Sequence, residues 1–131
     1  MNTFTFTPIE EKTLREIGVT AIILFGSQAR GVAGETSDYD IGVLGNNTGG
    51  SYDSIYDVVS SKIGKLVDID IVFLGDAPME LQHHVASYGR ALFEAKPGLF
   101  ASYKEAVMDK YADFAPIRRM FQEHVLGRIP A

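Results

Sequence analysis

Two short motifs, a Gly-Ser pair and an Asp-x-Asp pair, lie at the ends of neighbouring apolar segments. Their spacing constrains this chain more than any other feature. Gly26 and Ser27 end the apolar run at residues 19–25, and Asp38 and Asp40 open the next run after ten intervening residues. Residues two apart on a strand point to the same face, so the two carboxylates should converge. Carboxylates on one rigid face suit Mg²⁺, which commonly also recruits substrate phosphates.

The Gly-Ser pair predicts a phosphate site beside that carboxylate pair. Where a strand ends and a short helix begins, backbone N–H groups without helical partners can receive a phosphate. No Gly-Lys-Ser/Thr follows, so the segment is not a P-loop. It is not a calcium loop either, because the twelfth position counted from Asp38 is Gly49 instead of glutamate. A metal site and a phosphate cradle on neighbouring strands together indicate nucleotidyl transfer.

Composition limits the classes of protein to consider. The 131 residues have the size of one domain, and no internal repeat or low-complexity segment divides residues 1–131. The absence of cysteine excludes disulfides, thiolate metal sites and cysteine nucleophiles. A formal net charge of −5 argues against a broad basic surface for long nucleic acids. The apolar runs are too short to span a membrane and the N-terminus lacks a signal peptide, so we expect a cytoplasmic protein without a membrane partner.

Strand-like and helix-like segments alternate along the chain, which predicts an α/β domain with a mixed β-sheet flanked by helices. A long helical region at residues 98–131 would close the chain. The predicted strands are 19–25, 38–44, 66–74 and 91–94, and the predicted helices are 8–17, 27–30, 51–63, 78–87 and 98–126.

Several boundary residues carry more specific expectations. Thr7 should cap the first helix and Ser51 the third, since hydroxyl side chains accept hydrogen bonds from the first free N–H groups. The glycine-rich connection at residues 45–50 is predicted to be a mobile loop over the site. Pro116 should kink or divide the last helix.

Nucleotidyl transfer also needs a carboxylate that positions the attacking hydroxyl and relieves it of its proton. Asp68 and Asp70 lie two apart on the predicted third strand, and either one could supply that group. Gly42 should follow Asp40 on the same face, where the missing side chain leaves room for metal or nucleotide. Arg30 could pair with a carboxylate or contact nucleotide phosphates, and the phosphate role is favoured.

The histidines and the C-terminal aromatic residues favour structural roles. His83, His84 and His124 lack the spacing of metal ligands, and the first two read as exposed helix residues. A stripe at three- and four-residue intervals most often packs on its own domain, although this region is long relative to the small sheet and part of it could serve a partner. The stripe comprises Phe100, Tyr103, Val107, Tyr111, Phe114, Ile117, Phe121 and Val125.

The segment Gly26-Ser27-x-Ala29-Arg30-Gly31, followed by Ser37-Asp38-x-Asp40, resembles the signature of the minimal nucleotidyltransferase family. These are small members of the polymerase-β-type nucleotidyltransferase superfamily. A weaker similarity continues through residues 67–74, 89–94 and 111–116, and the fuller pattern resembles the antitoxin branch that partners HEPN-domain toxins. Enzymes of that branch transfer AMP from ATP to tyrosine hydroxyls of the toxin, a ribonuclease.

The resemblance implies a role for each site residue. Asp38 and Asp40 would ligate two Mg²⁺ ions, and Gly26 and Ser27 would hold the β- and γ-phosphates of ATP. The third acid of the family precedes two apolar residues, a variable residue and a leucine. Asp70 fits that pattern, which would make it the third metal-binding and catalytic carboxylate.

The resemblance therefore implies a small nucleotidyltransferase fold and a Mg²⁺-dependent protein adenylyltransferase, an antitoxin with ATP as substrate and a HEPN toxin as partner. Two alternatives remain. A small-molecule adenylyltransferase usually carries an added substrate-binding domain, for which this chain has little room. A binding module could neutralise a toxin without chemistry, but the intact acidic triad argues against that role.

Overall fold

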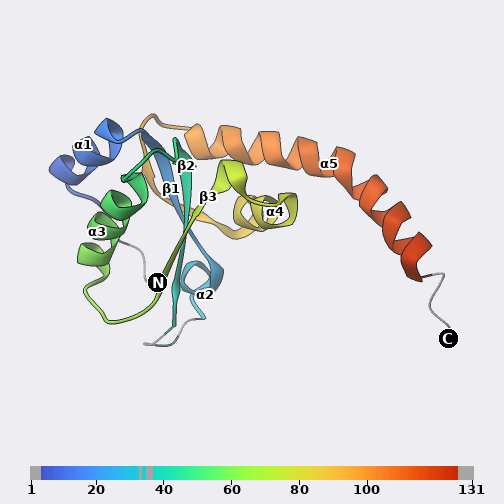
Figure 1. The fold of residues 1–131 in the computed structure, drawn as a ribbon, viewed down its shortest axis with the longest axis horizontal. Helices are drawn as coiled ribbons and strands as arrows, with labels where there is room; N and C mark the ends of the chain where they lie inside the picture. The colour runs from blue at the N-terminus through green and yellow to red at the C-terminus, as the bar shows by residue number, and fades with distance from the viewer. Residues whose placement is uncertain (1–3, 33, 35–36, 127–131) are drawn as a thin grey trace.

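A four-stranded sheet forms the centre of the structure (Figure 1). The computed structural model describes residues 4–32, 34 and 37–126. The strand order is β3-β2-β1-β4; β2 and β3 run parallel and β1 is antiparallel to both of its neighbours, which confirms the predicted mixed sheet. The strands span Val19–Phe25 (β1), Tyr39–Gly45 (β2), Ile69–Phe73 (β3) and Arg90–Glu94 (β4).

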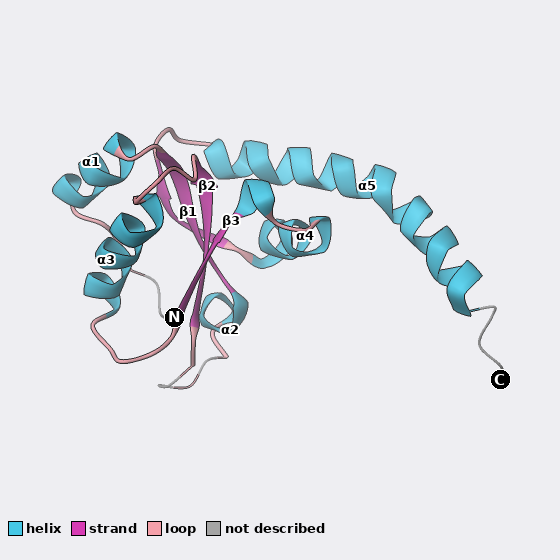
Figure 2. Cartoon of the chain, viewed as in Figure 1, coloured by secondary structure: helices cyan, strands magenta, loops and turns pink. Residues whose placement is uncertain are grey.

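Helices cover both faces of this sheet, as Figure 2 shows. Helices α1 and α3 lie on one face, α4 and the first part of α5 lie on the other, and the short helix α2 follows directly after β1. A single 3₁₀ turn, η1, follows β3. The helices span Pro8–Glu16 (α1), Gly26–Arg30 (α2), Ser51–Ile63 (α3), Met79–Tyr88 (α4) and Leu99–Leu126 (α5), and η1 spans Leu74–Asp76.

Each face of the sheet has its own apolar core, because alternate residues of β1 point in opposite directions. Ile22 and Leu24 pack beneath α1 and α3. Ile23 and Phe25 pack beneath α4 and α5. Burial on both faces explains why β1 reads as an uninterrupted apolar run in the sequence.

One of the two predicted helix caps is present and the other is wrong. The Thr7 hydroxyl accepts from the Glu10 N–H at 3.2 Å while Glu10 accepts from the Thr7 N–H at 2.7 Å, a reciprocal capping box. Helix α3 instead has Gly50 as its N-cap, and Ser51 is its first helical residue. The buried Ser51 hydroxyl donates to the Thr48 carbonyl at 2.7 Å, so it closes the turn that precedes the helix.

Most predicted boundaries agree with the structure within one or two residues, but β3 is shorter than predicted. The expected strand began at Leu66, whereas β3 begins at Ile69. Leu66 is fully exposed, with a relative accessibility of 107%. Residues 64–68 therefore form the connection from α3 to β3. The prediction placed the strand too early because Leu66 and Val67 are apolar, as strand residues usually are.

Helix α5 is continuous through Pro116, so of the two outcomes expected there, a kink or a division, the division does not occur. The last turns of α5 run at an angle to its first turns (Figure 1), which agrees with the alternative expectation of a kink. Phe100 and Val107 are buried against the domain, whereas Ile117 and Phe121 are 65% and 69% exposed. The predicted packing of the aromatic stripe thus holds for the first half of α5 only. Neither α5 nor any other helix in the described part of the chain is long and apolar enough to cross a membrane.

Candidate active site

The parallel pairing of β2 with β3 places two of the predicted carboxylates side by side. Asp40 on β2 and Asp70 on β3 are register partners. Their neighbours Tyr39, Ile41 and Ile71 pack into the core beneath α1 and α3. Because side chains alternate along a strand, both carboxylates lie on the opposite face, the face that α4 covers.

Asp38 and Asp68 lie just before their respective strands, where the two segments are tied together. The Tyr39 N–H donates to the Asp68 carbonyl at 3.0 Å. Strand β2 begins at Tyr39, one residue later than the predicted start at Asp38. Asp38 is therefore an exposed residue that directly precedes the strand. Asp70 therefore lies within the strand beside Asp40, whereas Asp68 lies in the approach to it.

Asp40 has an unfavourable electrostatic environment. Burial raises the pKa of the Asp40 carboxyl above its ordinary value, and the negative charges of Asp70 and Asp38 raise it further. His84 acts in the opposite direction and lowers that pKa. Asp38 and Asp70 thus lie close enough to Asp40 to repel its charge, and a cation or a donor would relieve that repulsion.

Gly26 lets the backbone of α2 approach Asp40. Its φ of +74° is a conformation that side-chain-bearing residues rarely adopt, and a Cβ atom at this position would overlap the Asp40 carboxylate. Ser27 follows in the first turn of α2. Phe25 is the N-cap of that helix, and its side chain provides no capping hydrogen bond. The glycine therefore brings the start of α2 and the Asp40 carboxylate into direct contact.

Two hydrogen bonds between α2 and other segments fix this helix in place, and sequence reasoning predicted neither of them. The buried Gln28 donates from Nε2 to the Ser37 carbonyl at 3.0 Å, which connects α2 to the segment that enters β2. Arg90 donates from Nε to the Ala29 carbonyl at 2.8 Å, which connects α2 to β4. Both donors serve distant backbone acceptors, so no local pattern could have revealed them.

Arg30 extends from the last turn of α2 and is exposed. Within the described residues it forms no ion pair with a carboxylate, so the structural role considered for it is not observed there. Its contact with nucleotide phosphates stays a prediction.

The space expected beside Gly42 is not available to a ligand. A Cβ atom built on Gly42 would lie 3.0 Å from Cδ1 of Leu74, a fully buried residue of the second core. The glycine accommodates Leu74, which follows β3 directly. The prediction that this position leaves room for metal or nucleotide is therefore wrong.

The glycine-rich segment at residues 45–50 does not cover the carboxylates either. Strand β2 starts next to the site and ends at Gly45, which pairs with Val19 at the far end of β1. Five residues of extended chain separate Asp40 from Gly45, about 17 Å at the usual rise per residue. The predicted loop thus lies at the opposite end of the sheet, because the strand leads away from the site.

His84 is a residue of the site that the sequence-based interpretation treated as exposed. It is half-buried on α4, and its ring lies 6.3 Å from that of Phe25, centroid to centroid. The adjacent His83 instead stacks on Tyr111 of α5 at 3.7 Å. The sequence does indicate that the two histidines have different surroundings, because consecutive residues of a helix point in directions about 100° apart.

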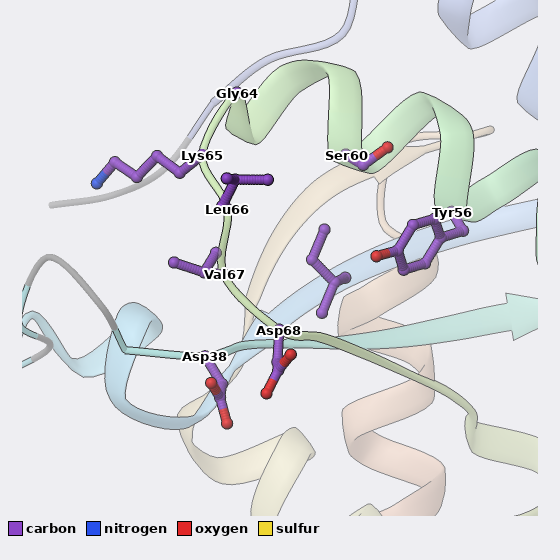
Figure 3. A pocket seen from close by; sticks show the side chains of 9 residues that line it. Asp38, Tyr56, Ser60, Gly64, Lys65, Leu66, Val67 and Asp68 are labelled. Carbon is purple, nitrogen blue, oxygen red and sulfur yellow. The ribbon is translucent and has the colours of Figure 1, made fainter.

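A cavity of about 680 Å³ adjoins the carboxylates between α3 and residues 64–69. Figure 3 shows Asp38 and Asp68 side by side at its edge, with their carboxylates directed away from Leu66 and Tyr56. Asp40 and Asp70 do not line it. The cavity therefore borders the carboxylate cluster without enclosing it.

The chain belongs to the polymerase beta nucleotidyltransferase family. The family model described as "Polymerase beta, Nucleotidyltransferase" matches residues 9–98, which include β1, α2, β2 and β3. This establishes the chain as a nucleotidyltransferase and confirms the superfamily that the sequence motif resembles. None of the curated proteins compared with the chain matches it.

Solved structures of toxin–antitoxin complexes share the fold. One, a toxin–antitoxin complex with AMP-PNP, superposes with a TM-score of 0.70 at 24% identity, covering 88% of this chain and 94% of the other. A MntA–HepT complex gives 0.64 at 22% identity, with 92% and 99% covered. A complex of a tri-AMPylated Shewanella oneidensis HEPN toxin with an MNT antitoxin gives 0.64 at 21%, with 90% and 97% covered. At these identities the likeness establishes a common fold.

The carboxylates have the donor chemistry that Mg²⁺ requires. Their oxygens are hard ligands. Burial raises the pKa of Asp40 most and the charges of Asp70 and Asp38 raise it further, and a bound dication would offset both effects. Among the described residues, no three His, Cys, Asp or Glu side chains already stand in an arrangement that holds an ion. Mg²⁺ usually keeps waters and takes phosphate oxygens as ligands, so a site completed by nucleotide fits these residues.

Proposed function

We propose that this chain is a Mg²⁺-dependent adenylyltransferase that transfers AMP from ATP to tyrosine hydroxyls of a HEPN-domain toxin. The observation that carries the proposal is the pairing of Asp40 with Asp70 in the sheet while Gly26 brings α2 against Asp40. This arrangement joins a carboxylate pair to the strand–helix junction where the family motif lies. The likeness to complexes that contain AMP-PNP or an AMPylated HEPN toxin supports the choice of nucleotide and acceptor.

Each site residue has a distinct task in this proposal. Asp38, Asp40 and Asp70 would hold Mg²⁺, which when bound supplies positive charge to the triphosphate. Gly26 and Ser27 would bind the β- and γ-phosphates through backbone N–H groups and the serine hydroxyl. The fixed position of α2, held by distant hydrogen bonds on both sides, would keep the phosphate chain aligned with the carboxylates.

The reaction is an in-line displacement at the α-phosphorus. The tyrosine oxygen forms a bond to that phosphorus as the bond to the bridging oxygen breaks, and pyrophosphate leaves with the electron pair. Asp70 accepts the phenolic proton. It lies on the edge strand β3, which is separated from α2 and from the phosphates that α2 would bind, so an incoming hydroxyl can reach it. The acceptor would thus approach from the β3 side of the sheet.

The form of the site favours an acceptor on another folded protein. The cavity beside Asp38 borders the carboxylates without enclosing them, so it provides no closed pocket around the reacting atoms. A folded partner brings its own shape and holds its hydroxyl in position. The exposed second half of α5, with Ile117 and Phe121, offers an apolar surface for such a partner.

The test is transfer to a HEPN-domain protein, which the proposal expects to be encoded next to this chain. The two purified proteins are incubated with Mg²⁺ and ATP labelled at the α-phosphate, and intact-mass spectrometry counts the AMP units added to each. We expect AMP on tyrosine residues of the partner, none without Mg²⁺, and little label on this chain. The proposal would be overturned if the partner stays unmodified and is still neutralised by a variant of this chain that lacks all three carboxylates. That result would indicate inhibition by binding alone.

A further inference from the structure

His84 lies over the row of sheet residues that carries the carboxylate pair. Phe25, Asp40 and Asp70 are register partners across β1, β2 and β3. The His84 ring contacts the Phe25 ring edge to face, with an interplanar angle of 76°, and lies 5.2 Å from the Tyr88 ring. Helix α4 thus places an imidazole over Phe25, the member of this row that directly precedes α2.

The ring contacts orient this imidazole without occupying its nitrogens. In the described part of the chain, neither ring nitrogen of His84 has a hydrogen-bond or ion-pair partner. No side-chain nitrogen or oxygen in that part is both fully buried and unpaired, so these nitrogens reach solvent. An aromatic side chain fixed by its neighbours and left with an accessible donor is suited to bind a ligand at the site.

The charge around the site identifies the chemistry of that ligand. Asp70 and Asp38 act on Asp40 as negative charges, and among the described residues His84 is the one basic group that acts on the pKa of Asp40. Phe25 is also the N-cap of α2, so the residue that the His84 ring contacts directly precedes Gly26 and Ser27 in the chain. A donor on His84 therefore lies near the start of α2, where a nucleotide would carry its terminal phosphates.

We propose that His84 donates a ring N–H to the β- or γ-phosphate of the bound nucleotide and is a substrate-contacting residue of the site. The inference rests on the proposed function, because it assumes that the triphosphate lies at the start of α2. His84 would hold the leaving pyrophosphate from the α4 side while the backbone of α2 holds it from the β1 end.

His83 provides a matched control. It is the preceding residue on the same helix, it is also half-buried, and its ring stacks on Tyr111 of α5 instead of Phe25. Replacing either histidine removes an imidazole and an aromatic contact from α4. Only His84 contacts the row that contains Asp40.

The experiment compares the affinities of four proteins for ATP and for AMP, each with Mg²⁺, by isothermal titration calorimetry. The proteins are the wild type, His84→Phe, His84→Ala and His83→Ala, and thermal melts establish that each is folded. His84→Phe keeps a ring against Phe25 and removes only the donor. We expect both His84 variants to bind ATP about tenfold or more weakly, since hydrogen bonds to charged groups are strong. We expect AMP binding to be unchanged, and His83→Ala to bind both nucleotides like the wild type.

Three results would overturn the inference while leaving the proposed function intact. His84→Phe could bind ATP as tightly as the wild type, which would reduce His84 to a packing residue. Its affinities for ATP and AMP could fall equally, which would place the contact on the α-phosphate, the sugar or the base. His83→Ala could weaken ATP as much as His84→Phe, which would indicate a general effect on α4. A wild-type chain that binds no ATP would overturn the proposed function and this inference together.

Discussion

The side chain of Leu74 occupies the space that Gly42 leaves beside it on the face of the sheet that carries Asp40. Two methyl carbons and Cγ of Leu74 lie 3.0 to 3.2 Å from the position of a Cβ atom on Gly42. Leu74 has no accessible surface and belongs to the core beneath α4 and α5. The start of η1 is thereby packed onto β2 two residues from the carboxylate.

Gly42→Ala should therefore destabilise the fold by about 1 to 3 kcal/mol, the usual cost of forcing an extra methyl into a packed core. Chemical denaturation measures this free energy of unfolding. Gly42→Ala combined with Leu74→Val should recover part of the loss, because the smaller side chain makes room. If the alanine variant unfolds like the wild type, Leu74 moves freely and the position is not a packing constraint.

Gly26→Ala should abolish transfer through the collision of its methyl group with the Asp40 carboxylate. We expect a loss of about 100-fold or more in rate, as displaced catalytic groups commonly cause. Gly98→Ala is the control, because Gly98 has a similar φ of +88° but nothing within 4 Å of a Cβ atom. Both variants carry the backbone strain of about 1 to 2 kcal/mol, and only Gly26→Ala should lose activity. Equal activity losses would attribute the effect to strain alone.

Replacing Asp38 and Asp40 together by Asn should leave a folded protein without transfer activity, because an amide keeps the shape and loses the charge that stabilises a dication. Asp40→Asn alone should raise the melting temperature in the absence of metal, since it removes a half-buried charge that repels Asp70 and Asp38. A melting temperature below that of the wild type would show that the Asp40 charge is compensated within the protein. Transfer at the wild-type rate by the double variant would remove these residues from the catalytic site.

Asp70→Asn should abolish transfer while ATP binding is largely kept, because Asp38 and Asp40 still serve the triphosphate. Asp68→Asn should be milder, since Asp68 lies before β3 whereas Asp70 is the register partner of Asp40. Single-turnover transfer and equilibrium binding of an ATP analogue separate the two effects. The reverse order of severity would assign the third carboxylate to Asp68.

Glu10 should make the stability of the protein depend on pH in the acidic range. Its hydrogen-bonded ion pair with Lys62, at 2.7 Å, and the Thr7 N–H hold the pKa of Glu10 below its ordinary value of 4.5. An acid with a lowered pKa in the folded state contributes stability above its unfolded pKa, and that contribution disappears as the pH falls through the folded pKa. Denaturation of wild type and Glu10→Gln between pH 6 and pH 2.5 should therefore converge at the acid end. Glu11→Gln is the control, and an equal change in its pH profile would exclude a specific role for the ion pair.

Much of the fold could be predicted because its signals are local. Glycines at positions 18 and 26 bound β1, and the Thr7–Glu10 pair marks the start of α1 by chemistry within four residues. The start of β3 could not be predicted in this way, because Leu66 and Val67 are as apolar as the strand that they precede. Only the pairing with β2 decides where that strand begins.

In the candidate site, too, the features with local sequence signals could be predicted and those that depend on packing could not. The motif at Gly26 and the spacing of Asp38 and Asp40 predict the carboxylate cluster from local sequence alone. His84, Gln28 and Arg90 reach the site from segments that are distant in sequence or face a direction that only packing determines. The same dependence on packing explains the wrong expectation for Gly42, since Leu74 comes from beyond the next strand.

Helix α5 contains two kinds of backbone hydrogen bond. Those near Phe100 and Val107 can break only if the apolar core beneath them opens, whereas those near Ile117 and Phe121 border water. The free energy of local opening should therefore fall along the helix from its start to its end. Amide hydrogen exchange would record this as a gradient of protection within one continuous helix, and a bound partner would be detected as the slowing of exchange at its outer end.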